Sequence, residues 1–73
     1  MKKLMVIGGG KWQIPLIKKA KEMGHYVVCS NLYPDSPAFQ YADSAAVANV
    51  LDREENLRIA KMYQPDAVIT DQS

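Results

Sequence analysis

The feature of this sequence that most constrains its fold is an apolar strand that runs directly into three consecutive glycines. Residues 4–7 are all apolar, Gly8, Gly9 and Gly10 follow, and an amphipathic helix begins near Trp12. At such a junction, backbone N–H groups can approach a ligand closely, with the positive end of a helix dipole behind them. The junction therefore predicts the edge of the molecule at which a ligand binds, but not the chemistry of that ligand.

The composition excludes several classes of partner. The chain has 73 residues, enough for one small domain, and nine Lys and Arg against eight Asp and Glu give a net charge of +1. This balance offers no electrostatic reason to bind nucleic acid or an anionic membrane. The apolar runs are too short for a membrane span of about 20 residues or for a signal peptide. Because Cys29 is the only cysteine, no internal disulfide can form, and we expect a soluble protein in a reducing cytoplasm.

Strand and helix patterns alternate along the chain. Strands are predicted at 4–7, 26–30, 45–50 and 67–70, a helix at 12–23, one helical turn at 38–42 and a second helix from Asp52 to about Tyr63. Gly24 is expected to end the first helix in the left-handed conformation, and Pro65 to stop the second. Asp52 followed three residues later by Glu55 resembles a capping box. The residues expected on the packed sides are Ile14, Leu16, Ile17, Ala20 and Met23 of the first helix and Leu57, Ala60 and Tyr63 of the second.

The order of these elements predicts an α/β fold: a small Rossmann-like open parallel sheet of about four strands, in the order 3-2-1-4, with helices on both faces. Residues 1–73 would form a single domain. The glycine turn and Asp71, Gln72 and Ser73 would then be neighbours at the carboxyl edge of the sheet, where ligands bind in open α/β folds. One helix cannot cover a whole face, and bare apolar sheet surface indicates that the chain is part of something larger.

A dinucleotide site is the first hypothesis to test against the glycine turn. The fingerprint G-x-G-x-x-G is met at Gly8 and Gly10, but its third glycine is replaced by Gln13. An acidic residue is also required at the end of the second strand to hold the ribose hydroxyls, and the sequence has Ser30 and Asn31 there. The pattern therefore does not favour a classical NAD or FAD site.

Single residues with reactive or aromatic side chains have ordinary structural interpretations. Trp12, at the start of the helix, is expected to pack or to lie at an interface, with stacking on a substrate ring as the alternative. Cys29 is expected to be a buried small apolar residue. His25 has no spaced partner for a metal ion and is expected to face solvent. Asp43 is expected to brace a loop through backbone N–H groups. None of these side chains predicts a catalytic or a metal site.

The sequence resembles the N-terminal domain of ATP-grasp ligases. The resemblance covers the whole chain and rests on the spacing between three segments: residues 6–10 with Pro15 and Gly24, then residues 33–38, then residues 41–43. It is strongest to the ATPase subunit of phosphoribosylaminoimidazole carboxylase and to formate-dependent glycinamide ribonucleotide transformylase. Biotin carboxylase and carbamoyl-phosphate synthetase are similar more distantly.

The resemblance implies a substrate-side domain. In this family other domains bind ATP and magnesium and form an acyl phosphate, whereas the N-terminal domain supplies one wall of the acceptor pocket. The implied substrate-binding residues are Gly8, Gly9, Gly10, Lys11, Trp12, Thr70, Asp71, Gln72 and Ser73. Relatives often carry an acidic or amide residue where this sequence has Lys11, and a cation there favours an acceptor with a carboxylate or phosphate. No cofactor, metal ion or catalysis is expected of the 73 residues alone.

Three hypotheses follow from the sequence. The leading one is the N-terminal substrate-side domain of an ATP-dependent carboxylate–amine ligase or carboxylase, with a small-molecule substrate and the ATP-grasp domains of the same polypeptide as its partners. The second is a Rossmann-like module that binds a nucleotide or dinucleotide, as a sensor or a dehydrogenase fragment. The third is a fragment without binding of its own that folds only as a homo-oligomer, by self-association across its open sheet faces.

Overall fold

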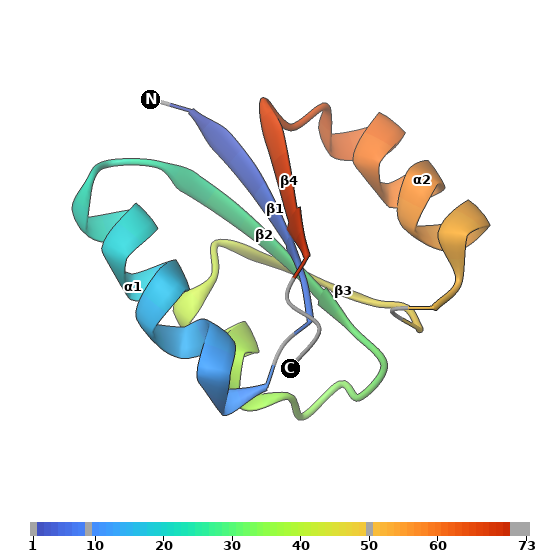
Figure 1. Cartoon of the computed structure of the whole chain (residues 1–73), viewed down its shortest axis with the longest axis horizontal. Coiled ribbons are helices and arrows are strands. Elements are labelled where there is room, and N and C mark those ends of the chain that lie inside the picture. Colours follow the sequence, from blue (N-terminus) through green and yellow to red (C-terminus); the bar gives the residue numbers. More distant parts are fainter. Residues whose placement is uncertain (1, 9, 50, 71–73) are drawn as a thin grey trace.

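A four-stranded, all-parallel sheet with the order β3-β2-β1-β4 forms the centre of the molecule. The computed structural model describes residues 2–8, 10–49 and 51–70. The fold class and the strand order predicted from the sequence are confirmed (Figure 1). The elements in chain order are β1 (Lys3–Ile7), η1 (Lys11–Gln13), α1 (Ile14–Glu22), β2 (Tyr26–Asn31), η2 (Pro37–Tyr41), β3 (Ser44–Val47), α2 (Arg53–Tyr63) and β4 (Ala67–Thr70).

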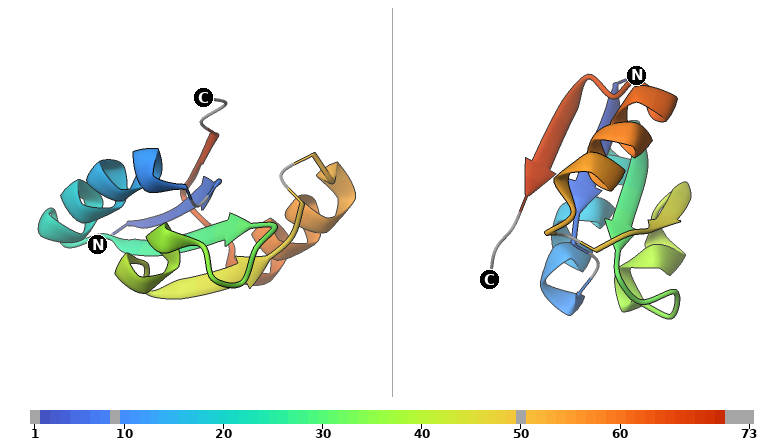
Figure 2. Two further views of the ribbon diagram at one scale, coloured as in Figure 1. Left: turned by 90° about the horizontal axis from the view of Figure 1, so that it is seen from below. Right: turned by 90° about the vertical axis from the view of Figure 1, so that its right-hand side faces the viewer.

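Each face of the sheet has its own apolar cluster, because successive side chains of a strand point to opposite faces. Helix α1 and η2 cover one face and α2 covers the other (Figure 2). Val6 of β1 belongs to the first cluster and Met5 to the second. The wholly apolar run of β1 is thus explained by its position between two neighbouring strands and two helix layers. The first cluster contains Val6, Ile17, Ala20, Val27, Cys29 and Ala38, and the second contains Met5, Ala48 and Ile59.

The first helix packs along a narrower stripe than the sequence predicted. Ile17 and Ala20 are buried as expected, but Leu16 and Met23 are exposed. At about 100° of rotation per residue, Leu16 lies a quarter-turn from Ile17, and Met23 has already left the helix as its C-cap. Gly24 follows with a φ of 84°, so the predicted left-handed helix end is confirmed.

The second helix has the predicted start and end but a different packed side. The Asp52 carboxylate accepts a hydrogen bond from the Glu55 N–H at 3.1 Å, which confirms the expected N-cap. Ile59 and Asn56 are buried, whereas Leu57 is 56% exposed, so its assignment to the packed side is wrong. Ala60 and Tyr63 are partly buried against the second cluster, as expected.

Strand β3 ends at Val47, earlier than the predicted residue 50, because Asn49 forms a local turn. The side-chain oxygen of Asn49 accepts a hydrogen bond from the Leu51 N–H at 2.9 Å, and its carbonyl accepts one from the Asp52 N–H at 2.9 Å. This local turn competes with the strand and leads the chain directly into α2. Among the described residues, no helix has both the length and the apolarity needed to cross a bilayer.

Candidate functional site

The carboxyl ends of β1 and β4 lie side by side. Ile7 is paired with Thr70 in the register of the two strands, so the chain leaves both strands at one edge of the sheet (Figure 1). The prediction that the glycine turn and the end of the fourth strand are neighbours is therefore confirmed for the described residues, which end at Thr70. Four of the predicted binding residues, namely Gly9, Asp71, Gln72 and Ser73, lie outside the described residues, and a binding role for the whole set stays a prediction.

The two described glycines of the turn have different roles. Gly8 is buried with a φ of 113°, a conformation that side-chain-bearing residues rarely adopt. Its N–H donates to the Ser30 carbonyl at 2.7 Å, so this donor is used within the fold. Gly10 has an ordinary φ of −74° and begins η1. A Cβ on Gly10 would lie 3.2 Å from the Oε1 of Gln13, a close contact with a side chain that is 5% exposed.

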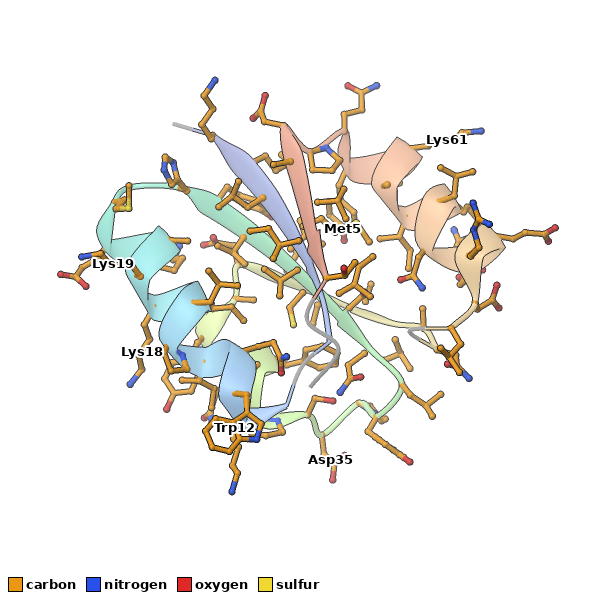
Figure 3. The ribbon with its side chains drawn as sticks, in the orientation of Figure 1. Met5, Trp12, Lys18, Lys19, Asp35 and Lys61 are labelled. Atoms are coloured by element: carbon orange, nitrogen blue, oxygen red, sulfur yellow. The ribbon has the colours of Figure 1, made fainter. Side chains whose placement is uncertain are left out.

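Lys11 and Trp12 project from the first turn after the glycines. Trp12 is 69% exposed, so the expectation that it packs is wrong. It lies in η1, ahead of the part of α1 that contacts the sheet, and Figure 3 shows it at the lower end of the molecule in that view. The Lys11 Nζ lies 5.4 Å from the centroid of the Trp12 ring, a cation–π distance. A cation and an aromatic surface are thus presented to solvent together.

A buried polar pair at this edge was missed by the sequence analysis. The Ser30 Oγ donates to the Asn56 Oδ1 at 3.0 Å, and the Asn56 Nδ2 donates to the carbonyls of Asn49 and Asp52 at 2.8 and 2.9 Å. A signal for it exists in the sequence: Asn56 lies three residues before Ile59 and so falls on the packed stripe of α2. The pair ties the end of β2 to the start of α2.

The loop after β2 is held by a second side-chain amide. The Asn31 Nδ2 donates to the Ser36 Oγ at 2.8 Å, and the Ser36 N–H donates to the Tyr33 carbonyl at 3.1 Å. Asn31 stands where a dinucleotide site needs a carboxylate for the ribose. Its amide is engaged in ordering the loop instead.

Asp43 braces the opposite end of β2, as predicted. Its carboxylate accepts a hydrogen bond from the Val27 N–H at 2.8 Å and forms an ion pair with Lys21 of α1. The hydrogen bond from Lys21, and then that from Val27, hold the pKa of Asp43 below its ordinary value. The carboxylate therefore joins α1, β2 and the start of β3 in its charged form.

We expect the replacement Asp43→Asn to reduce the dependence of stability on acid pH. Because the folded-state pKa is lowered, the contribution of Asp43 is present above the pKa of an unfolded aspartate, about 3.9, and is lost as the pH falls through the folded value. Urea midpoints measured between about pH 7 and about pH 3 should therefore fall less steeply in the variant. The exposed loop variant Asp35→Asn is the control, and an equally steep fall in Asp43→Asn would contradict the assignment.

The described residues at this edge show neither a reactive cysteine nor a clustered metal site. Cys29 is buried, and its burial raises the pKa of the thiol to about 11, so it is a thiol and not a thiolate at neutral pH. Its Sγ donates weakly to the Gly8 carbonyl at 3.4 Å. Within residues 2–8, 10–49 and 51–70, no three His, Cys, Asp or Glu side chains gather into a group that could hold a metal ion.

An open groove of about 660 Å³ separates α2 from β1 and β4. Its floor is apolar, and Arg53 and Glu54 stand on the α2 side. Val68 of β4 and Leu57 of α2 are exposed in it. This is the bare sheet surface that the sequence analysis expected beside a single helix. The lining residues are Met5, Ile7, Arg53, Glu54, Asn56, Leu57, Ala60, Val68 and Thr70.

The comparisons with known proteins find enzymes with similar sequences and folds, although no family model matches the sequence. The formate-dependent phosphoribosylglycinamide formyltransferase of Chlorobium phaeobacteroides is 35% identical over 68 residues, which cover 93% of this chain and 18% of that enzyme. The crystal structure of N5-carboxyaminoimidazole ribonucleotide synthetase from Thermotoga maritima has a TM-score of 0.88 at 38% identity, covering 99% of this chain and 19% of that one.

A third relative carries a nucleotide. The ADP complex of an N5-carboxyaminoimidazole ribonucleotide synthetase has a TM-score of 0.85 at 30% identity, covering 97% of this chain and 18% of that one. The chain thus spans less than one fifth of the length of each of these relatives. The matches fall on their N-terminal domain region.

Proposed function

Because the chain is homologous to the N-terminal domain region of ATP-grasp superfamily ligases, we propose that it is the substrate-side domain of such a ligase. It contributes contacts to the acceptor substrate and does not catalyse the reaction alone. The observation that carries the proposal is the pairing of Ile7 with Thr70, which brings the glycine turn and the end of β4 to one edge of the sheet. Residues 1–73 are then one domain of a longer polypeptide.

The acceptor proposed for this edge is a small phosphoribosyl compound. The relatives are named for phosphoribosylglycinamide and for N5-carboxyaminoimidazole ribonucleotide, which both carry a ribose phosphate. The exposed ammonium of Lys11 suits a phosphate or carboxylate group, and the neighbouring Trp12 ring offers a face for stacking. The ADP complex of one relative supports a nucleotide in the whole enzyme. We propose that ATP and magnesium bind to the whole enzyme mainly through residues outside this chain.

The alternative, a dinucleotide-binding module, finds support in the sheet order alone. Two features of the edge weigh against it. The Gly8 N–H is engaged by the Ser30 carbonyl, and the Asn31 amide is engaged by Ser36. A pyrophosphate would therefore find one donor fewer at the turn, and a ribose would find no carboxylate at the end of β2.

Titration of the isotope-labelled chain with phosphoribosylglycinamide, ATP and NAD tests the proposal. We expect phosphoribosylglycinamide to shift the amide signals of Gly8, Gly10, Lys11 and Thr70, and NAD to leave them unchanged. Shifts at the amino edge of the sheet, or tighter binding of NAD than of phosphoribosylglycinamide, would overturn the assignment.

The variant Lys11→Ala is expected to weaken binding of phosphoribosylglycinamide by about ten- to a hundredfold, since a hydrogen bond to a charged group contributes about 1.5–3 kcal/mol. Lys19→Ala is the matched control, because Lys19 is an equally exposed lysine on the outer side of α1 (Figure 3). Dissociation constants from the same titration measure the difference. Equal affinities in the two variants would show that Lys11 does not contact the ligand.

A further inference from the structure

We propose that Asn56 is a positioning residue of the acceptor site: through Ser30 it holds the glycine turn in a fixed relation to the start of α2. The role in binding rests on the proposed function, whereas the mechanical link is independent of it. Neither residue is among the binding positions predicted from the sequence. Ser30 and Asn56 both lie beneath the carboxyl edge of the sheet.

Ser30 is the residue through which the link passes. It is 0% exposed and is paired with Ile7 in the register of β1 and β2. Its carbonyl accepts the hydrogen bond from the Gly8 N–H at 2.7 Å, while its Oγ donates to the Asn56 Oδ1 at 3.0 Å. One residue thus joins the turn after β1 on one side and helix α2 on the other.

Asn56 extends the link to the connection between β3 and α2. Its Nδ2 donates to the Asn49 carbonyl at 2.8 Å and to the Asp52 carbonyl at 2.9 Å. Both amide hydrogens and the amide oxygen are therefore used, each in a different direction. The side chain fixes where α2 begins relative to the end of β2.

The hydrogen bond between Ser30 and Asn56 is not by itself a large source of stability. Replacing both partners of a buried hydrogen bond by apolar groups of similar shape is nearly neutral, whereas removing one partner leaves the other unsatisfied. An apolar pair would occupy the same space, but without a directional hydrogen bond it would not fix the orientation of α2 relative to β2. The polar pair therefore supplies a geometric constraint, and that constraint acts at the edge where the substrate is proposed to bind.

The position of Asn56 explains why the constraint matters to the site. Asn56 lines the groove together with Ile7 and Thr70, so it lies near the carboxyl ends of β1 and β4. Gly10 and Lys11 follow Gly8 two and three positions later in the chain. A change in the Gly8–Ser30 contact therefore displaces the Lys11 ammonium and the Trp12 ring from the proposed acceptor.

The test compares Ser30→Ala, Asn56→Leu and the double variant. Phosphoribosylglycinamide is the probe, and its dissociation constant, the urea midpoint and amide exchange are measured for each protein. Ser30→Ala should weaken binding of phosphoribosylglycinamide about fivefold, the equivalent of one neutral hydrogen bond. It should also speed hydrogen exchange of the Gly8 amide. The double variant should regain part of the stability lost in the single variants, because Ser30 and Asn56 then leave no unsatisfied side chain and the Asn49 and Asp52 carbonyls keep their backbone donors, but it should not regain affinity.

Ser44→Ala is the matched control. It also removes a hydroxyl, one that is hydrogen-bonded to the Tyr26 Oη at the other end of the sheet. It should leave the affinity within about twofold of the parent. If affinity returns with stability in the double variant, or if Ser44→Ala weakens the probe as much as Ser30→Ala does, Asn56 is only structural.

The exchange data separate this proposal from the proposed function. If the parent chain binds no phosphoribosylglycinamide, the proposed function fails. The link is then still decided by exchange at Gly8, which should accelerate in Ser30→Ala and remain unchanged in Ser44→Ala. Unchanged exchange at Gly8 in Ser30→Ala overturns the link whether or not the probe binds.

Discussion

Replacement of Gly8 by alanine is expected to destabilise the chain by about 1–3 kcal/mol, the cost of holding an L-residue in a sparsely populated backbone conformation. Gly8 has a φ of 113° and is buried, and its N–H must still reach the Ser30 carbonyl at 2.7 Å. Either the strain is retained or this hydrogen bond is lost, and both outcomes lower the urea midpoint. The same change should weaken the binding of any ligand at the glycine turn.

Gly10→Ala is the control for this prediction. The backbone of Gly10 is ordinary at a φ of −74°, and the nearest atom to a new Cβ would be the side-chain Oε1 of Gln13 at 3.2 Å, not a backbone atom. Its cost should stay within about 0.5 kcal/mol. Equal losses in the two variants would mean that crowding, and not the left-handed backbone, determines the preference for glycine here.

The second large effect is expected from Met5→Ala. Met5 is 0% exposed in the central strand and packs with Ala48 and Ile59 under α2. Truncating a buried methionine costs about 2–5 kcal/mol, which approaches the whole stability of about 5 kcal/mol at the low end for small domains. We therefore expect the variant to be largely unfolded by circular dichroism at 25 °C.

Met62→Ala tests whether burial causes this loss. Met62 is the same residue type on α2 but is 60% exposed, so its truncation should change the free energy of unfolding by no more than about 0.5 kcal/mol. A Met5→Ala variant as stable as Met62→Ala would show that the cluster under α2 contributes little to the fold.

The sequence predicted the fold well because its strongest signals are local. The apolar run in β1, Gly8 after it and Gly24 at the helix end each mark where an element ends. The short crossovers then permit few arrangements of four parallel strands. The resemblance to ATP-grasp ligases, drawn from residue spacing, agrees with the relatives found. The end of β3 was misplaced because the turn at Asn49 depends on its own side chain.

The site was predicted less completely, because its details depend on the register between strands. The pairing of Ile7 with Ser30 places the Ser30 carbonyl where it accepts the Gly8 N–H, and no local pattern shows this. Periodicity also treats polar residues as outward-facing, so Asn56 was missed and the neighbouring Leu57 was assigned inward in its place. Trp12 was misjudged because large aromatic residues are usually buried.

The separation of the two apolar clusters has a consequence for how the native state fluctuates. The cluster under α1 contains more buried residues than the cluster under α2, and the two share only the backbone of the sheet. The thinner layer, with the groove at its side, is therefore expected to open at a lower free energy than the other. Any molecule or polypeptide that fills this groove would rigidify the half of the domain that is weakest by itself.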